Sequence, residues 1–108
     1  MGSSSRRQMK SPKAATAAEC STLEQLPNVG PAMAADLRLL GIEAPQALQG
    51  RDGLQLYHAL CTVTGQRHDP CVLDTLLAVV DFMNGAPPAP WWAYTPRRKA
   101  MAIDPPRD

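Results

Sequence analysis

The pattern of hydrophobic and polar positions predicts helices throughout the central part of the chain. The broadest apolar stripe lies within residues 70–83, where hydrophobic side chains recur on one face of a helix. Its members are Val72, Leu73, Leu76, Val79, Val80 and Met83. No segment alternates convincingly with the two-residue period of a half-buried strand. The sequence therefore predicts a compact all-α domain of four to five helices, with this segment as its main core helix.

Capping residues place the ends of the two longest helices. Asp69 before Pro70 combines an acidic N-cap with proline at the first helical position. Asp52 is expected to cap the preceding helix, and Gly65 is expected to end it. The inward residues expected of that helix are Leu56, Leu60 and Val63, with Leu54 and Tyr57 beside them. The two helices and their connection predict a helix-loop-helix unit.

Two shorter helices are expected nearer the N-terminus. Ser21-Thr22-Leu23-Glu24 fits a capping box at the start of a short helix that runs into Pro27. The next helix begins after Gly30 and ends at Gly41. Its apolar face is formed by Met33, Leu37 and Leu40. Residues 45–48 then suggest one further helical turn.

The segment between these two short helices predicts a tight turn at the start of a helix. Pro27 restricts φ on the way into the turn, and Asn28 is the non-glycine residue that most readily adopts positive φ. Gly30 removes the side chain where a ligand would approach the backbone, and Pro31 suits the first helical position. Unpaired N–H groups and the helix dipole favour an anion at such a start. The turn therefore predicts a phosphate site.

This turn resembles the helix-hairpin-helix motif of DNA-binding and DNA-repair proteins, whose usual form is L-P-G-I-G-P-K-x-A-x-x-L. The chain reads Leu26-Pro27-Asn28-Val29-Gly30-Pro31-Ala32-Met33-Ala34-Ala35-Asp36-Leu37. A wider resemblance, to the small bacterial pathogenicity locus family, covers most of the chain. It includes residues 26–42, Leu56-Tyr57, Leu60-Cys61, Gly65 to Asp74 and Pro90-Trp91-Trp92. Members of that family are also labelled helix-hairpin-helix or mitomycin-resistance proteins. The C-terminal domain of the competence regulators is similar over the first hairpin only.

The resemblance implies DNA binding through backbone phosphates and without sequence specificity. Backbone amides of the turn would meet phosphate, and basic side chains would add electrostatic attraction. The expected DNA-phosphate-binding residues are Asn28, Val29, Gly30, Ala32, Met33, Arg67, Arg97, Arg98 and Lys99. In related hairpins, carbonyl groups of the turn can also hold a monovalent cation. The family label names no reaction, so the chain is expected not to be an enzyme and to need no cofactor.

Two departures from the usual motif bear on this expectation. Asn28 replaces the first glycine, and Ala32 replaces a lysine or arginine that often contacts phosphate. The missing charge reduces the expected affinity. A helix-hairpin-helix can also serve only as a packing element. The competing hypothesis is therefore a protein-interaction module that assists a repair or stress-response complex.

Charge is distributed unevenly along the 108 residues, whose formal net charge is +1. Residues 20–95 carry three basic and seven acidic side chains. The excess of positive charge lies in an expected disordered arm, residues 1–19, and in an expected flexible tail, residues 97–108. Residues 20–96 are expected to form the single folded domain. Because non-specific affinity for DNA comes mainly from cations, binding by that domain alone is expected to be weak.

The tail before residue 97 holds most of the large aromatic area. Residues 87–96 are rich in proline and contain Trp91 and Trp92, which predicts an extended strap. One tryptophan is expected to close the core, and the other to remain partly exposed. The alternative is a nucleic-acid contact in which bases stack on the indole rings next to the basic run.

A second constellation suggests a metal or thiol site. His58, Cys61, His68 and Cys71 have a spacing that zinc could use, although the more specific paired C-x2-C spacing is absent. A catalytic alternative has Asp69 orient His68 beside a Cys71 nucleophile, with the helix start lowering the thiol pKa. The structural alternative is two buried thiols where helices cross, and the sequence favours it.

The remaining features concern the cellular location expected of the protein. Three cysteines give no disulfide framework and are expected to be free thiols. The sequence has no apolar run of membrane-spanning length and no segment with the apolar stretch of a signal peptide. We therefore expect a cytoplasmic protein without a membrane partner.

Overall fold

The computed structural model describes residues 13–101, so the expectations for residues 1–12 and 102–108 lie outside the described part. Four α-helices are present there: α2 (Pro31–Leu39), α3 (Gly53–Thr64), α4 (Pro70–Met83) and α5 (Thr95–Lys99). Four 3-10 helices precede or connect them: η1 (Ala17–Glu19), η2 (Leu23–Gln25), η3 (Pro45–Leu48) and η4 (Trp91–Tyr94). Within residues 13–101 there is no strand, and the all-α prediction is confirmed.

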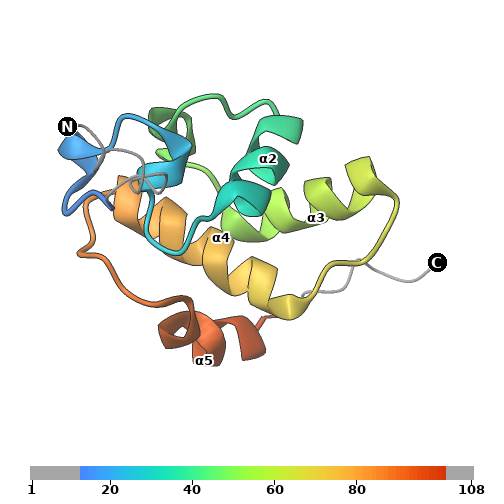
Figure 1. The fold of residues 1–108 in the computed structure, drawn as a ribbon. Helices are drawn as coiled ribbons and strands as arrows, with labels where there is room; N and C mark the ends of the chain where they lie inside the picture. The colour runs from blue at the N-terminus through green and yellow to red at the C-terminus, as the bar shows by residue number, and fades with distance from the viewer. Residues whose placement is uncertain (1–12, 102–108) are drawn as a thin grey trace, which may run out of the picture.

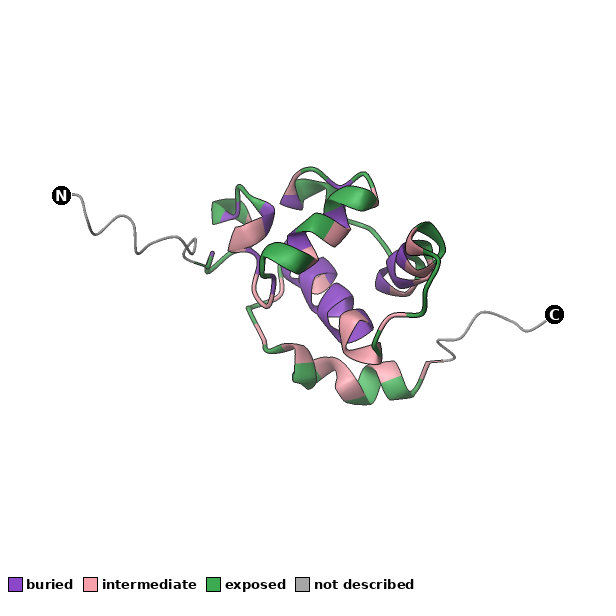
Figure 2. Cartoon of the chain, turned by 45° about the vertical axis from the view of Figure 1, so that its right-hand side comes forward, coloured by how far each residue is buried: buried purple, intermediate pink, exposed green. Residues whose placement is uncertain are grey.

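Helix α4 is the centre of the fold, as its apolar stripe predicts. Its residues from Leu73 to Val80 are all buried, and η3, α3, η4 and α5 pack around it (Figures 1 and 2). Gly53, the first residue of α3, lies directly against α4. A Cβ at that position would lie 2.9 Å from Leu77 Cδ2 and 3.2 Å from Leu77 Cα. Glycine therefore allows α3 to start directly against the backbone of α4.

Most of the predicted helix ends are confirmed. The Asp52 carboxylate accepts hydrogen bonds from Leu54 N at 2.9 Å and Gln55 N at 3.4 Å. Gly65 ends α3 with a φ of 71°. Asp69 occupies the N-cap position of α4, but its side chain makes no capping hydrogen bond. Of the two predicted features, it is Pro70 at the first helical position that favours the start of α4.

Three local predictions are corrected. The first short helix is η2, a single turn that follows the N-cap Thr22, and Gln25 rather than Glu24 closes its capping box. Gln25 Oε1 accepts from Thr22 N at 3.0 Å, because the N-cap is Thr22 rather than Ser21 and its N3 residue is Gln25. Val63 is not inward but 55% exposed, and Tyr57 is almost fully buried instead.

The two ends of the described chain are more structured than expected. Residues 13–19 include η1, and Ala14 is buried and donates its N–H to Gln25 O at 2.9 Å. The strap is extended only over residues 86–90, and the chain is helical from Trp91. The basic run 97–99 lies in α5, which packs against α4 (Figure 1). No helix within residues 13–101 has both the length and the apolar character needed to cross a membrane.

Candidate functional site

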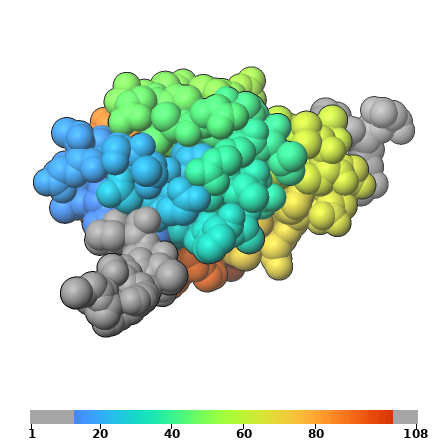
Figure 3. Space-filling view, turned by 45° about the horizontal axis from the view of Figure 1, so that its top comes forward, coloured from blue at the N-terminus to red at the C-terminus, as the bar shows by residue number. Residues whose placement is uncertain are grey.

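The η2–α2 turn, residues 26–30, connects two elements that lie side by side on one face of the molecule (Figure 3). Val29 N donates to Leu26 O at 3.2 Å, and both side chains are buried. Asn28 has a φ of 70°, which confirms the positive φ expected of it. The buried side chains of Leu26 and Val29 and the left-handed conformation of Asn28 thus determine the path of the backbone into α2.

The start of α2 is open. Gly30 is the N-cap and has a φ of −102° and a ψ of −172°, an extended conformation that any residue adopts. A Cβ at Gly30 would meet nothing within 4 Å, and no side chain caps the helix. Ala32 is exposed and Met33 is half-buried, and their amides lie in the first turn, before the helical hydrogen bonds begin with Ala34 N donating to Gly30 O.

The side chain of Asn28 has a structural task that the sequence did not reveal. Its Nδ2 donates to Ala89 O at 2.8 Å, and its Oδ1 accepts from Trp91 N at 3.2 Å. Asn28 therefore fastens the C-terminal segment to the turn. A glycine, the usual residue of the motif, would permit the same φ but would lack this bridge.

Lys13 reaches the turn from the other end of the chain. Its Nζ donates to three backbone carbonyl oxygens: Glu24 O at 2.9 Å, Leu26 O at 3.0 Å and Val29 O at 2.5 Å. These oxygens form a carbonyl cluster on one side of the η2–α2 turn. The sequence placed Lys13 in an expected disordered arm, because no pattern of neighbouring residues predicts a contact with residues 11 to 16 positions further along the chain.

An ion pair ties η2 to α2. Arg38 near the end of α2 donates to both carboxylate oxygens of Glu24, at 3.0 Å and 3.1 Å. The hydrogen bonds from Arg38 lower the pKa of Glu24 below its ordinary value. Because the side chains of Arg38 and Glu24 are 43% and 35% exposed, water screens the pair, and it fixes geometry more than it adds stability.

A groove of about 380 Å³ borders the turn on the side of the extended segment. It is mostly apolar, and its lining residues are Lys13, Ala14, Pro27, Asn28, Pro88, Ala89 and Pro90. Both terminal segments thus form walls of one groove beside the turn.

The four arginine and lysine residues expected to contact DNA do not gather at the turn. Arg67 lies in the connection from α3 to the start of α4, whereas the turn is hydrogen-bonded to Ala89 and Trp91, which follow the end of α4. Arg97 pairs with Asp81 at 2.9 Å, and Arg98 pairs with Asp74 at 2.9 Å. Lys99 is exposed at the end of α5. The charges of Arg97 and Arg98 are therefore largely offset within the protein.

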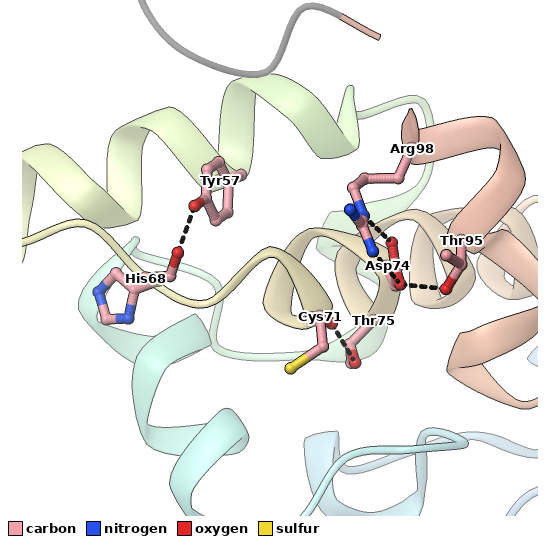
Figure 4. Close-up of polar contacts among 7 residues, drawn as sticks. All are labelled: Tyr57, His68, Cys71, Asp74, Thr75, Thr95 and Arg98. Carbon is pink, nitrogen blue, oxygen red and sulfur yellow. Dashed lines mark hydrogen bonds and ion pairs between the residues drawn. The ribbon is translucent and has the colours of Figure 1, made fainter. Parts of the chain in front are cut away.

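Arg98 belongs to a buried polar cluster on α4. Asp74 is fully buried, and its carboxylate accepts from Arg98 Nε at 2.9 Å and from Thr95 Oγ1 at 2.6 Å (Figure 4). The hydrogen bond to Asp74 raises the pKa of Arg98. Both partners come from α5, so this cluster docks α5 onto the core helix.

The metal and thiol hypotheses find no support in the described residues. No three His, Cys, Asp or Glu side chains within residues 13–101 lie together as metal ligands. His68 Nε2 hydrogen-bonds Thr64 Oγ1 at 2.8 Å, and its carbonyl accepts from the buried Tyr57 hydroxyl at 2.5 Å (Figure 4). Burial, followed by the charges of Asp69 and Asp74, raises the pKa of Cys71. A thiol nucleophile at a helix start would have a lowered pKa instead.

The prediction for the aromatic tail is confirmed for the exposed tryptophan and wrong for the one expected to close the core. Trp92 is 62% exposed and meets the half-buried Trp91 edge to face, with ring centroids 5.5 Å apart. Tyr94, rather than a tryptophan, is the aromatic residue of η4 that packs against the core. Burial is the main reason why the pKa of Tyr94 is raised.

Comparisons with known proteins agree with the resemblance noted in the sequence. The family described as Pathogenicity locus (Cdd1) matches residues 16–100. The mitomycin resistance protein McrB of Streptomyces lavendulae is 42% identical over 86 residues, which are 80% of this chain and 82% of that protein. No solved structure matches significantly. The chain belongs to the pathogenicity locus family.

Proposed function

We propose that this protein binds the sugar–phosphate backbone of DNA without sequence specificity, with the start of α2 acting as the second half of a helix-hairpin-helix. The observation that carries the proposal is the uncapped N-terminus at Gly30. Neither its φ nor internal packing requires glycine there, since a Cβ would meet open space. What the missing side chain provides is access to the first amides of α2.

The turn is also preorganised for such a ligand. Asn28 is held by Ala89 and Trp91, and the Lys13 ammonium lies on the carbonyls of the same turn. A phosphate approaching the amides would therefore meet a backbone that needs little further ordering. Asn28 is the side chain of this turn with the paired donor and acceptor that read base edges, and both are engaged by Ala89 and Trp91, so the proposal contains no sequence preference.

The name of the Streptomyces relative associates that protein with resistance to mitomycin. A DNA-binding role in a damage context is in keeping with that association. The internal pairing of Arg97 and Arg98 limits the proposed electrostatic contribution of α5. We therefore expect modest affinity that falls as salt rises.

The test is Gly30→Asp in the full-length chain, compared with Gly30→Asn. Both side chains fit the open space and cap α2, so thermal stability should stay equal or rise slightly. Asp adds a negative charge where phosphate would bind, whereas Asn covers the same amides without charge. Fluorescence anisotropy with a labelled duplex should show affinity reduced about tenfold or more by Asp and less by Asn.

Gln49→Glu is the control for net charge, because Gln49 is exposed in the η3–α3 connection. An equal loss of affinity in Gln49→Glu and Gly30→Asp would show that binding depends on overall charge and not on the turn. Undiminished binding by a folded Gly30→Asp variant would refute the mechanism. Absence of binding by the wild type at low salt would favour the alternative, in which the turn serves a protein partner.

A further inference from the structure

The indole of Trp92 is the largest apolar group that the described chain leaves open to water. Within residues 13–101 only Leu39, Val63 and Trp92 are large, apolar and exposed, and Trp92 is 62% exposed. Leu39 and Val63 belong to α2 and α3, which lie on one side of α4, whereas η4 and α5 lie on the other (Figures 1 and 2). On its own side of the core helix, Trp92 is therefore the exposed side chain of this kind within the described residues.

A single exposed ring fits a small planar ligand better than a folded protein partner. A stable protein interface buries roughly 800 Å² on each partner, whereas one aromatic side chain buries about 250 Å² at most. One ring is enough, however, to stack against a nucleobase, and such stacking contributes substantially to the binding of single strands. The size of the exposed group thus favours a base as its ligand.

The backbone that carries this indole is fixed on both sides. Before Trp92, the backbone N–H of Trp91 donates to Asn28 Oδ1 at 3.2 Å, and the two indole rings meet edge to face with centroids 5.5 Å apart. After Trp92, the side chain of Tyr94 packs against the core. A ligand that stacks on Trp92 would therefore meet a ring that needs little further ordering.

The charge of the same segment favours an anionic ligand. Residues 82–101 contain three basic side chains and no acidic one. Asp81 and Asp74 on α4 offset Arg97 and Arg98, and Lys99 is exposed at the end of α5. The segment keeps an excess of positive charge after this pairing, so a nucleotide that stacks on Trp92 brings its phosphate to a favourable region.

Trp92 is also linked closely to the start of α2. Asn28 lies two positions before Gly30 and bonds to the residue directly before Trp92. Consecutive Cα atoms are about 3.8 Å apart, so the path from Gly30 through the Asn28 side chain to the Cα of Trp92 is about 20 Å at most. A few nucleotides of one DNA strand span such a distance.

We propose that Trp92 is a stacking platform for an unpaired nucleobase, and that the protein prefers DNA in which a single-stranded stretch adjoins a duplex. The inference rests on the proposed function, since the start of α2 holds the phosphate backbone while the indole takes a nearby base. In an intact duplex each base is stacked on its neighbours, and unstacking it is costly. Every base has a π face, so the contact adds no sequence preference.

The test measures fluorescence anisotropy of the full-length protein with three labelled probes. One is a blunt duplex, one carries a single-stranded thymidine extension at its 3′ or its 5′ end, and one carries an abasic extension with the same number of phosphates. The wild type should bind the thymidine extension about fivefold or more tightly than the abasic one. Because only the bases differ between these two probes, electrostatic attraction cannot produce this preference.

Trp92→Leu should lose the preference and bind the blunt duplex as the wild type does. Trp92→Phe keeps a smaller ring and should retain part of the preference. Val63→Ala is the matched control, since it shortens another exposed apolar side chain on α3 and should leave the preference unchanged. Equal affinity of the wild type for the thymidine and abasic extensions would overturn the proposal, and so would a Trp92→Leu variant that keeps the preference.

The proposed phosphate site is judged separately, by Gly30→Asp on the blunt duplex. Loss of binding by Gly30→Asp together with an undiminished thymidine preference in Trp92→Leu would refute the stacking platform alone. Undiminished binding of the blunt duplex by Gly30→Asp would refute the phosphate site, and the inference about Trp92 would fall with it.

A fluorescence measurement covers the case in which Trp92→Leu disturbs the fold. The chain has two tryptophans, so Trp91→Phe leaves Trp92 as the sole indole and keeps a ring at the half-buried position. Stacking on a base quenches indole fluorescence. At saturation the thymidine-extended duplex should quench this emission more strongly than the abasic one. Equal quenching by the two probes would contradict the proposed role of Trp92.

Discussion

The amide side chain of Asn28 accepts a hydrogen bond from Trp91 N at 3.2 Å across 63 positions of sequence. Its other end donates to Ala89 O at 2.8 Å, so a single side chain pairs with the backbone of the extended segment on both sides of Pro90. The residue that gives the turn its left-handed conformation is therefore also the attachment point of the C-terminal segment.

The first prediction concerns Asn28→Gly, which keeps the positive φ without strain and removes both hydrogen bonds. We expect a loss of roughly 1–2 kcal/mol in the free energy of unfolding. Faster amide hydrogen exchange at Trp91 would locate the loss in the C-terminal segment. Asn28→Asp is the control, since it keeps the acceptor for Trp91 and removes only the donor for Ala89. Equal exchange rates in both variants and wild type would contradict the bridge.

The second prediction concerns the buried pair of Asp74 and Arg98. Arg98→Met leaves the fully buried carboxylate with Thr95 as its remaining partner from α5, and should be strongly destabilising. The double variant Arg98→Met/Asp74→Leu removes the orphaned charge as well, and should be more stable than the single variant. Urea unfolding measures both. A double variant less stable than Arg98→Met would show that the cluster stabilises beyond its charge balance.

The third prediction contrasts two glycines. Gly53→Ala places a Cβ within 3.2 Å of the backbone of Leu77, and we expect it to destabilise the fold by about 1–3 kcal/mol. Gly30→Ala meets open space and has an ordinary φ, so its expected cost is only that of a poorer N-cap residue, smaller than that of Gly53→Ala. Thermal unfolding of the two variants checks the difference. Equal effects would mean that α3 and α4 separate easily at Gly53.

The fourth prediction concerns acid pH. Arg38 lowers the pKa of Glu24 in the folded state, so the folded protein binds this proton less tightly than the unfolded chain does. The stabilisation is present above the unfolded pKa of Glu and is lost as pH falls through the lower folded value. Wild type should therefore exceed Glu24→Gln in stability at about pH 6, and this advantage should shrink as pH falls below the ordinary pKa of a glutamate. High salt should shrink the difference at pH 6. A difference independent of pH would assign it to packing.

Features set by neighbouring residues were predictable from the sequence. The stripe of α4, the cap at Asp52 and the left-handed Asn28 and Gly65 each follow from residue type and spacing within one or two turns. The start of η2 was misplaced by one position, because Ser21 with Glu24 and Thr22 with Gln25 both match the pattern of a capping box.

Features set by distant residues were not predictable. Lys13 looks like one more cation of a polar arm until the carbonyls of residues 24, 26 and 29 are placed around it. Arg97 and Arg98 look like a free basic run until α5 packs on α4 and brings Asp81 and Asp74 within reach. Composition fixes how many charges exist, but only tertiary packing decides which of them remain available to a ligand.

The meeting of both terminal segments at one turn has a practical consequence for mapping activity. Removing residues up to Lys13 would expose three carbonyls, and removing residues from Ala89 onward would release Asn28. Either deletion would loosen the turn, and the deletion from Ala89 would also remove the basic side chains of α5, so a loss of binding would not show which of these changes caused it. Single substitutions, with a fusion partner kept well clear of both ends, are the sound way to locate the site.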